Sequence, residues 1–123
     1  MTELFEAGEK LYRAVYPPNI MPLFWKENGE LSSAVFKDKN GLSVERSGTR
    51  TEEIIISNMR LFFYGTIISV FVGDCILCGA FLKYLPTRRS RYHTEIHGSE
   101  EKIPLSQSQC KFLAKRARVC AEI

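Results

Sequence analysis

The sequence predicts a single α+β domain over residues 1–123, with a central antiparallel hairpin and flanking helices. The length of 123 residues is typical of one domain. Hydrophobic residues make up 45% and charged residues 25%, the proportions of a folded globular chain. Helical and extended patterns both occur along the chain, without an internal repeat. These observations exclude an intrinsically disordered chain, a collagen-like repeat and a disulfide-dense mini-protein.

The first part of the chain is expected to hold one helix followed by short extended pieces. Leu4, Phe5, Leu11 and Val15 are partly in helical register, and Pro17 prevents continuation beyond them. Further along, Asn-Gly is typical of a tight bend between extended segments. The expected elements are a helix over Glu3–Val15, an irregular segment over Asn19–Glu30, and extended pieces over Leu31–Phe36 and Leu42–Glu45, with the bend at Asn40-Gly41.

The remaining elements are predicted from helix caps and from β-branched or aromatic runs. Thr51 is a good N-cap, and Glu52 and Glu53 after it suit the positive end of a helix dipole. Ser106 is expected to cap the last helix in the same way. The expected elements are helices over Glu52–Phe62 and from Ser106 to Arg118, strands over Thr66–Val72, Cys75–Tyr84 and Tyr92–Ile96, and a basic loop over Pro86–Tyr92.

The run Leu61–Leu82 is the most apolar part of the chain and allows two interpretations. It is long enough to cross a bilayer as a helix. However, a charged Asp74 near its centre costs about 2.5–3.5 kcal/mol on insertion scales. Gly73-Asp74 is also typical of a tight turn between two strands. We therefore expect a buried hairpin here and membrane association to be disfavoured, with a small membrane protein kept as the alternative.

The charge distribution predicts an anionic partner. The net charge is +3, and residues 83–118 contain nine Lys and Arg against three Glu. A basic region of this kind favours nucleic acid or a nucleotide phosphate. The expected contacts are the loop arginines Arg88, Arg89 and Arg91, together with the last helix. An ordinary solvated surface and a protein partner are the alternatives left open.

The four cysteines raise the questions of compartment and of metal binding. The N-terminus is acidic and has no apolar signal region, so a cytoplasmic protein with reduced thiols is expected. Cys75, Cys78, His93 and His97 have the spacing of a Cys2His2 zinc site. The pair Ile76-Leu77 between the thiols is too apolar for a zinc turn. A redox role needs a helix N-terminus at the first cysteine, which the strand expected here does not provide. We expect buried thiols and no cofactor, with a structural zinc module as an alternative.

A set of polar residues is the candidate ligand site. Serine hydroxyls and arginine forks suit a phosphate or ribose-phosphate group, and a nearby imidazole can act as a general acid or base. The alternative is that the serines satisfy turn backbones and that Arg13 lies on a helix face. The set comprises Arg13, Ser32, Ser33, Ser43, Arg46 and His93.

Several short motifs are spread over most of the chain. They are Tyr12-Arg13, Ser32-Ser33-Ala34-Val35-Phe36, Leu42-Ser43-Val44 and His93-Thr94-Glu95-Ile96-His97-Gly98. Together these motifs resemble a family of short, uncharacterised prokaryotic proteins. In that pattern the histidine matching His93 and the glycine matching Gly98 recur, whereas a matching cysteine pair does not. The Tyr-Arg and Ser-Ser elements also resemble parts of ADP-ribosyltransferase folds, a resemblance that implies Glu95 as a catalytic candidate.

The favoured functional hypothesis is a small cytosolic accessory protein that binds nucleic acid or a nucleotide through its basic C-terminal third. The alternative is an enzyme acting on a nucleotide or RNA, by ADP-ribosyltransferase-like or phosphate-ester chemistry. In that case Arg13 and Ser32 would hold phosphate or ribose, while His93 or Glu95 transferred a proton.

Overall fold

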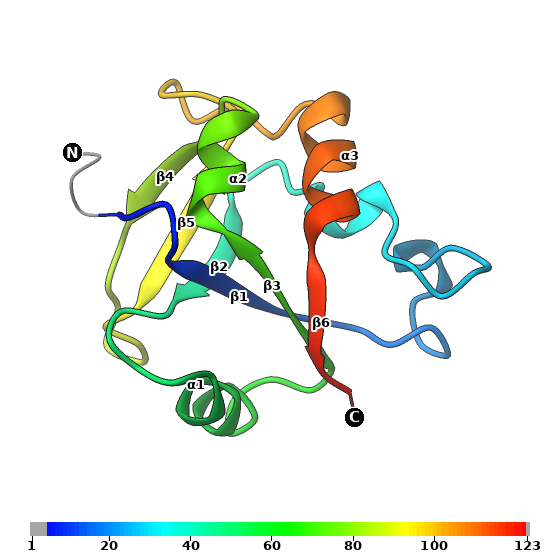
Figure 1. The fold of residues 1–123 in the computed structure, drawn as a ribbon, viewed down its shortest axis with the longest axis horizontal. Helices are drawn as coiled ribbons and strands as arrows, with labels where there is room; N and C mark the ends of the chain where they lie inside the picture. The colour runs from blue at the N-terminus through cyan, green and yellow to red at the C-terminus, as the bar shows by residue number, and fades with distance from the viewer. Residues whose placement is uncertain (1–4, 123) are drawn as a thin grey trace.

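A six-stranded sheet forms the centre of the computed structural model, which describes residues 5–122 (Figure 1). The strand order is β4-β5-β2-β1-β3-β6, and each neighbouring pair is antiparallel. Helices lie on both faces, which confirms the predicted α+β class. The strands are β1 (Lys10–Val15), β2 (Leu42–Arg46), β3 (Thr66–Phe71), β4 (Phe81–Tyr84), β5 (His93–His97) and β6 (Arg118–Ala121), and the helices are α1 (Glu52–Met59), α2 (Val72–Leu77) and α3 (Gln107–Arg116), with short 3-10 turns η2 (Pro22–Phe24) and η3 (Ser33–Phe36).

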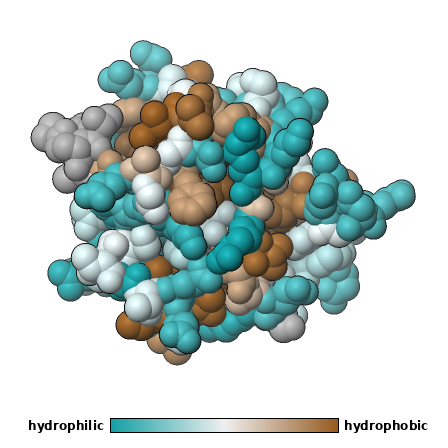
Figure 2. Space-filling view, viewed as in Figure 1, coloured by the Kyte–Doolittle hydropathy of each residue, from teal (hydrophilic) through white to brown (hydrophobic). Residues whose placement is uncertain are grey.

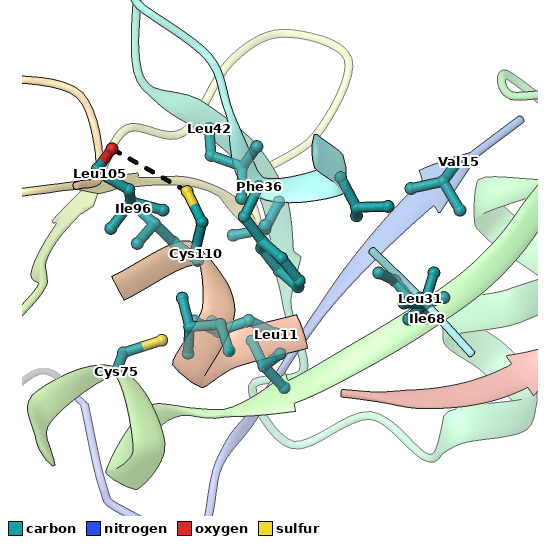
Figure 3. Packing of buried hydrophobic residues seen from close by; sticks show 14 of the residues in the cluster. Leu11, Val15, Leu31, Phe36, Leu42, Ile68, Cys75, Ile96, Leu105 and Cys110 are labelled. Atoms are coloured by element: carbon teal, nitrogen blue, oxygen red, sulfur yellow. Dashed lines mark hydrogen bonds between the residues drawn. The ribbon is translucent and has the colours of Figure 1, made fainter. Parts of the chain in front are cut away.

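One face of the sheet, here called the covered face, carries the main core. Alternate side chains of a strand point to opposite sides, and most of those on this side are aliphatic. They pack against α2, α3 and η3 (Figure 3). The buried members are Leu11, Val15, Leu31, Val35, Phe36, Leu42, Val44, Ile68, Val70, Val72, Cys75, Ile96, Leu105, Cys110 and Leu113.

The opposite face, here called the open face, is covered by α1 only in part. Ile55 and Met59 of α1 pack on Tyr12 of β1 and Ile67 of β3, with β6 alongside. The Tyr12 hydroxyl donates a hydrogen bond of 2.8 Å to Glu52. Burial, followed by this contact with the carboxylate, raises the pKa of Tyr12 well above its usual value. The second cluster is smaller than the first, so the open face contributes less to the core.

The predicted N-terminal helix is wrong, because Lys10–Val15 is the strand β1. It pairs with β3 along its whole length, from Lys10↔Phe71 to Val15↔Thr66. Leu11 and Val15 face the main core, whereas Tyr12 faces α1. Both sides of the segment are therefore apolar, a pattern that helical periodicity describes only partly. Glu3 and Leu4, at the start of the predicted helix, lie outside the described residues.

The predicted hairpin at Gly73-Asp74 is also wrong, because both residues lie in the first turn of α2. The strands before and after this helix occupy distant positions in the sheet. Gly73 instead allows the backbone of Ala7 to lie close to α2. The Gly73 N–H donates to Ala7 O at 2.9 Å, and an added Cβ would lie 3.2 Å from that oxygen. The apolar run is thus divided into strand, helix and strand, and no helix within residues 5–122 has the length and apolarity to cross a bilayer.

Most of the other predicted elements are confirmed, with differences at their ends. Thr51 caps α1 through the Ile54 N–H, and Ser106 with Gln109 forms a capping box at α3. The strands β2, β3 and β5 and the basic loop after β4 are present. Of the segment predicted as extended over Leu31–Phe36, Ser33–Phe36 is instead the 3-10 turn η3, whereas Leu31 forms an isolated antiparallel bridge with Trp25. The last helix ends at Arg116, and the edge strand β6 follows it.

Candidate functional site

The side chain of Arg13 links β1 to β2 beyond their paired residues. The two strands share only two residue pairs, Leu11↔Arg46 and Tyr12↔Glu45, although both strands continue beyond them. Arg13 is the first residue of β1 beyond these pairs, and its Nη1 reaches across to β2, where it donates to Ser43 O at 2.9 Å. Its Nε is buried and has no hydrogen-bond partner in the described part of the chain. Burial lowers the pKa of Arg13, and the negative charge of Asp38 opposes that shift.

His93 lies beside Arg13 and holds one defined tautomer when its ring is neutral. Its Nδ1 lies 2.9 Å from the carbonyl oxygen of Leu85, which only accepts, so Nδ1 carries the proton. The free Nε2 lone pair then accepts from the Ser43 hydroxyl at 3.2 Å. The register of β2 and β5 places Ser43 diagonally opposite His93. Arg13, Ser43 and His93 are here called the polar triad.

The polar triad lines a small cavity of about 80 Å³ on the open face. Met59 and Phe63 form part of its wall, so the three polar groups meet an apolar surface. A liquid water molecule takes up about 30 Å³, so this space suits a small chemical group. The sequence predicted these three residues as one set, and the structure brings them together.

A larger groove of about 380 Å³ adjoins this cavity. The loop between β4 and β5 brings Arg88, Arg89 and Arg91 to it. Arg50, which the sequence analysis did not single out, joins them from the loop before α1. We call this surface the arginine groove; it is lined by Glu45, Arg50, Asn58, Met59, Leu61, Phe62, Phe63, Thr87, Arg88, Arg89, Ser90, Arg91 and Tyr92.

Aromatic rings alternate with guanidinium groups in the arginine groove. Arg89 lies 5.4 Å from the centre of the Phe62 ring, and Arg50 lies 3.5 Å from that of Tyr92. Phe62 and Phe63 are 55% and 43% exposed, although both are large apolar side chains. Figure 2 shows apolar side chains at the lower edge of the molecule, where Figure 1 places α1. The ring faces are therefore available to a ligand.

The positive charge of the loop arginines is not neutralised locally. Arg50 forms an ion pair of 3.5 Å with Glu45. Among residues 5–122, no carboxylate lies within ion-pair distance of Arg88, Arg89 or Arg91. The groove and the small cavity share Glu45, Met59 and Phe63 in their walls, so the two spaces adjoin each other.

Ser32 and Ser33 lie apart from the polar triad, contrary to the predicted single site. Ser32 caps η3, donating to Leu23 O at 2.6 Å and accepting from the Ala34 N–H. Ser33 accepts from Gln107 of α3. The bonds of Ser32 match the alternative that the serines satisfy turn backbones, whereas the bond of Ser33 is with a side chain. Both serines line a separate depression of about 620 Å³, here called the lysine groove, with Lys26, Lys111 and Lys115.

Arg46 is also directed elsewhere, because the alternation of β2 places it on the covered face. It forms two hydrogen bonds with the Glu9 carboxylate, of 2.8 and 2.7 Å. Its guanidinium stacks on the rings of Phe5 and Tyr84. The bonds to Glu9 raise the pKa of Arg46 against the effect of burial. This arginine thus links β2 to the segment that precedes β1.

The residues of the predicted zinc pattern do not converge. Cys75 lies in α2 and is fully buried, which raises the pKa of its thiol. Cys78 at the end of the same helix donates its thiol to Cys75 O. His93 belongs to the polar triad, and His97 bonds Glu95 at 2.9 Å. In the described part of the chain, no group of three or more His, Cys, Asp or Glu could hold a metal ion.

The predicted catalytic candidate Glu95 lies apart from the polar triad. Its carboxylate accepts the hydrogen bond from the buried His97, and it does not line the cavity of the polar triad.

Comparison with protein-family models, with curated proteins and with solved structures finds no match for this chain.

Proposed function

We propose that the protein binds a single-stranded nucleic acid along the arginine groove. One observation carries the proposal: three arginines that have no carboxylate partner within residues 5–122 line the same groove as two exposed phenylalanine rings. Guanidinium groups pair with phosphates, and aromatic faces stack with unpaired bases. A duplex hides the faces of its bases, so the exposed rings favour a single strand. The cytosolic location expected from the sequence remains a prediction.

The last helix, also expected to contact the partner, does not contribute to this groove. Arg116 is paired with Asp74 and stacks on Phe112, and Arg118 after the helix is paired with Glu52. The helix lysines line the lysine groove, which shares no residue with the arginine groove. The proposal therefore places the partner on the loop between β4 and β5.

The test is a fluorescence-anisotropy titration of a labelled oligothymidylate at several salt concentrations. We expect wild-type affinity to fall steeply with salt, because bound phosphates release counterions. The triple variant R88A/R89A/R91A should bind more weakly and lower the salt slope by about 2, from about 0.7 for each single-strand phosphate contact. A thymidine mononucleotide titrated in parallel should bind far more weakly, because it spans fewer arginines.

The matched control is K26A/K111A/K115A, which removes the same charge from the lysine groove. It should retain the wild-type salt slope, apart from a small general effect of net charge. Equal losses in the two triple variants would show that bulk charge, rather than the arginine groove, attracts the oligonucleotide. A mononucleotide that binds as tightly as the oligonucleotide would replace the single strand by a nucleotide as the ligand.

A further inference from the structure

We infer that Ser43 and His93 are the nucleophile and the general base of a phosphodiester-cleaving site at the inner end of the arginine groove. The Ser43 hydroxyl and His93 Nε2 are 3.2 Å apart, within reach of a proton transfer. The choice of a phosphodiester substrate rests on the proposed function, because the adjoining groove is suited to phosphates. The serine–histidine pair itself does not depend on it.

The histidine is held by a third group, as a general base requires. The Leu85 carbonyl accepts the Nδ1 proton at 2.9 Å, which leaves Nε2 unprotonated toward the serine. A base positioned by a third group and adjacent to a hydroxyl is the usual arrangement of an activated nucleophile. Ser43 is exposed on the open face, so an incoming phosphorus atom can reach its oxygen.

The small cavity lined by Ser43 and His93 leaves space for one phosphoryl group. Its volume is about 80 Å³, and Arg13 is among the residues that line it. The Arg13 guanidinium donates to the backbone oxygen of Ser43 at 2.9 Å, so a positive charge lies close to the proposed nucleophile and favours an anionic phosphoryl group there.

The reaction proceeds in two balanced steps. In the first, Ser43 Oγ attacks phosphorus, its proton passes to His93 Nε2, and the bond from phosphorus to the leaving oxygen breaks. The leaving alkoxide takes the proton from His93, and a phosphoserine diester remains. In the second, water attacks that diester and gives a proton to His93 Nε2, the bond from phosphorus to Ser43 Oγ breaks, and His93 returns the proton to Ser43 Oγ. Water is the co-reactant, and the products are an alcohol and a phosphomonoester.

The first arm of the test uses diethyl 4-nitrophenyl phosphate, a neutral phosphotriester that needs no arginine groove. Wild-type protein should gain one diethylphosphoryl group, which peptide mass spectrometry should locate on Ser43. We expect no modification of Ser43→Ala, and a rate for His93→Gln at least a hundredfold lower, as is typical of removing a general base. Ser47→Ala, on the loop after β2, is the matched control and should react like wild type.

The second arm uses thymidine 5′-(4-nitrophenyl phosphate), an anionic diester, and follows 4-nitrophenolate release. Turnover should disappear in Ser43→Ala, whereas R88A/R89A/R91A should raise the KM and keep the triester rate. Loss of triester selectivity for Ser43, or labelling without diester turnover, would overturn this inference. An unchanged KM in the triple variant, with both reactions intact, would instead contradict the proposed nucleic-acid groove. Circular dichroism and urea unfolding of each variant separate loss of chemistry from loss of fold.

Discussion

The two faces of the sheet differ in what covers them and in what their side chains do. The side chains of the covered face are mainly aliphatic and are packed against α2, α3 and η3. The open face has α1 over β1, β3 and β6, while the polar residues Ser43 and His93 remain on its other half. Burial of apolar surface stabilises a fold, whereas exposed polar groups are available to a ligand. The comparison indicates that stability comes mainly from one face, and it places the proposed function on the other.

Truncating a residue on the covered face should give the largest loss of stability. Phe36 is almost completely buried between the sheet and α3, so Phe36→Ala removes packing and leaves a cavity. We expect the free energy of unfolding in urea to fall by about 3–5 kcal/mol. Ser43→Ala on the open face is exposed and should change it by less than about 0.5 kcal/mol. Similar losses in the two variants would remove the distinction between the faces.

Removing an exposed ring from the arginine groove should weaken oligonucleotide binding and leave the stability of the fold almost unchanged. Phe62→Ala should weaken oligothymidylate binding by about 1–3 kcal/mol, the range for one stacked base. Its unfolding free energy should change little, because the ring is exposed. Leu77→Ala, an exposed apolar residue of α2, is the control and should bind like wild type. Anisotropy and urea unfolding measure the two quantities, and weaker binding by the Leu77 variant would contradict this assignment.

The buried tyrosine under α1 predicts a loss of stability at alkaline pH. The pKa of Tyr12 is raised in the folded state by burial and by Glu52, so the unfolded chain releases this proton first. Its contribution is therefore complete below the unfolded value of about 10 and declines above it, by about 1.4 kcal/mol per pH unit. Urea unfolding at a series of pH values measures the decline. Tyr12→Phe should reduce this slope, and an unchanged slope would show that other groups cause it.

The smallest expected loss of stability on the covered face concerns the capping box of α3. Ser106→Ala removes the bond to the Gln109 N–H and should lower stability by about 1 kcal/mol. Ser108→Ala, within the same helix, should cost less because it caps no backbone group. Both variants should bind the oligonucleotide like wild type, because α3 lies on the covered face. Urea unfolding distinguishes them, and equal losses would assign the effect to helix propensity rather than to the cap.

The sequence was most informative where a local rule decides the structure. Thr51 and Ser106 marked helix starts because a cap depends on residues only three positions apart. Lys10–Val15 was assigned to a helix because its strand character depends on partners in β2 and β3, which are distant in sequence. The turn expected at Gly73-Asp74 failed for a related reason, since Gly73 makes room for the Ala7 backbone.

The sequence predicted the residue types of the candidate site, but it predicted only some of the residues that form it. Arg13, Ser43 and His93 do meet, but the sheet register that joins them comes from pairing across β1, β2 and β5. Arg46, only three residues beyond Ser43, faces the other side because β-strand side chains alternate. Arg50 was missed because its place in the groove depends on the loop before α1, not on a motif.

The most direct test of this difference between the two faces is an amide proton–nitrogen NMR titration of the whole chain with an unlabelled oligothymidylate. Binding at the arginine groove should shift the amide signals of residues 61–63 and 87–92, on the open face. The signals of residues 26–33 and 111–115, around the lysine groove, should stay in place. Shifts confined to the lysine groove, or no shifts at saturating oligonucleotide, would contradict the account.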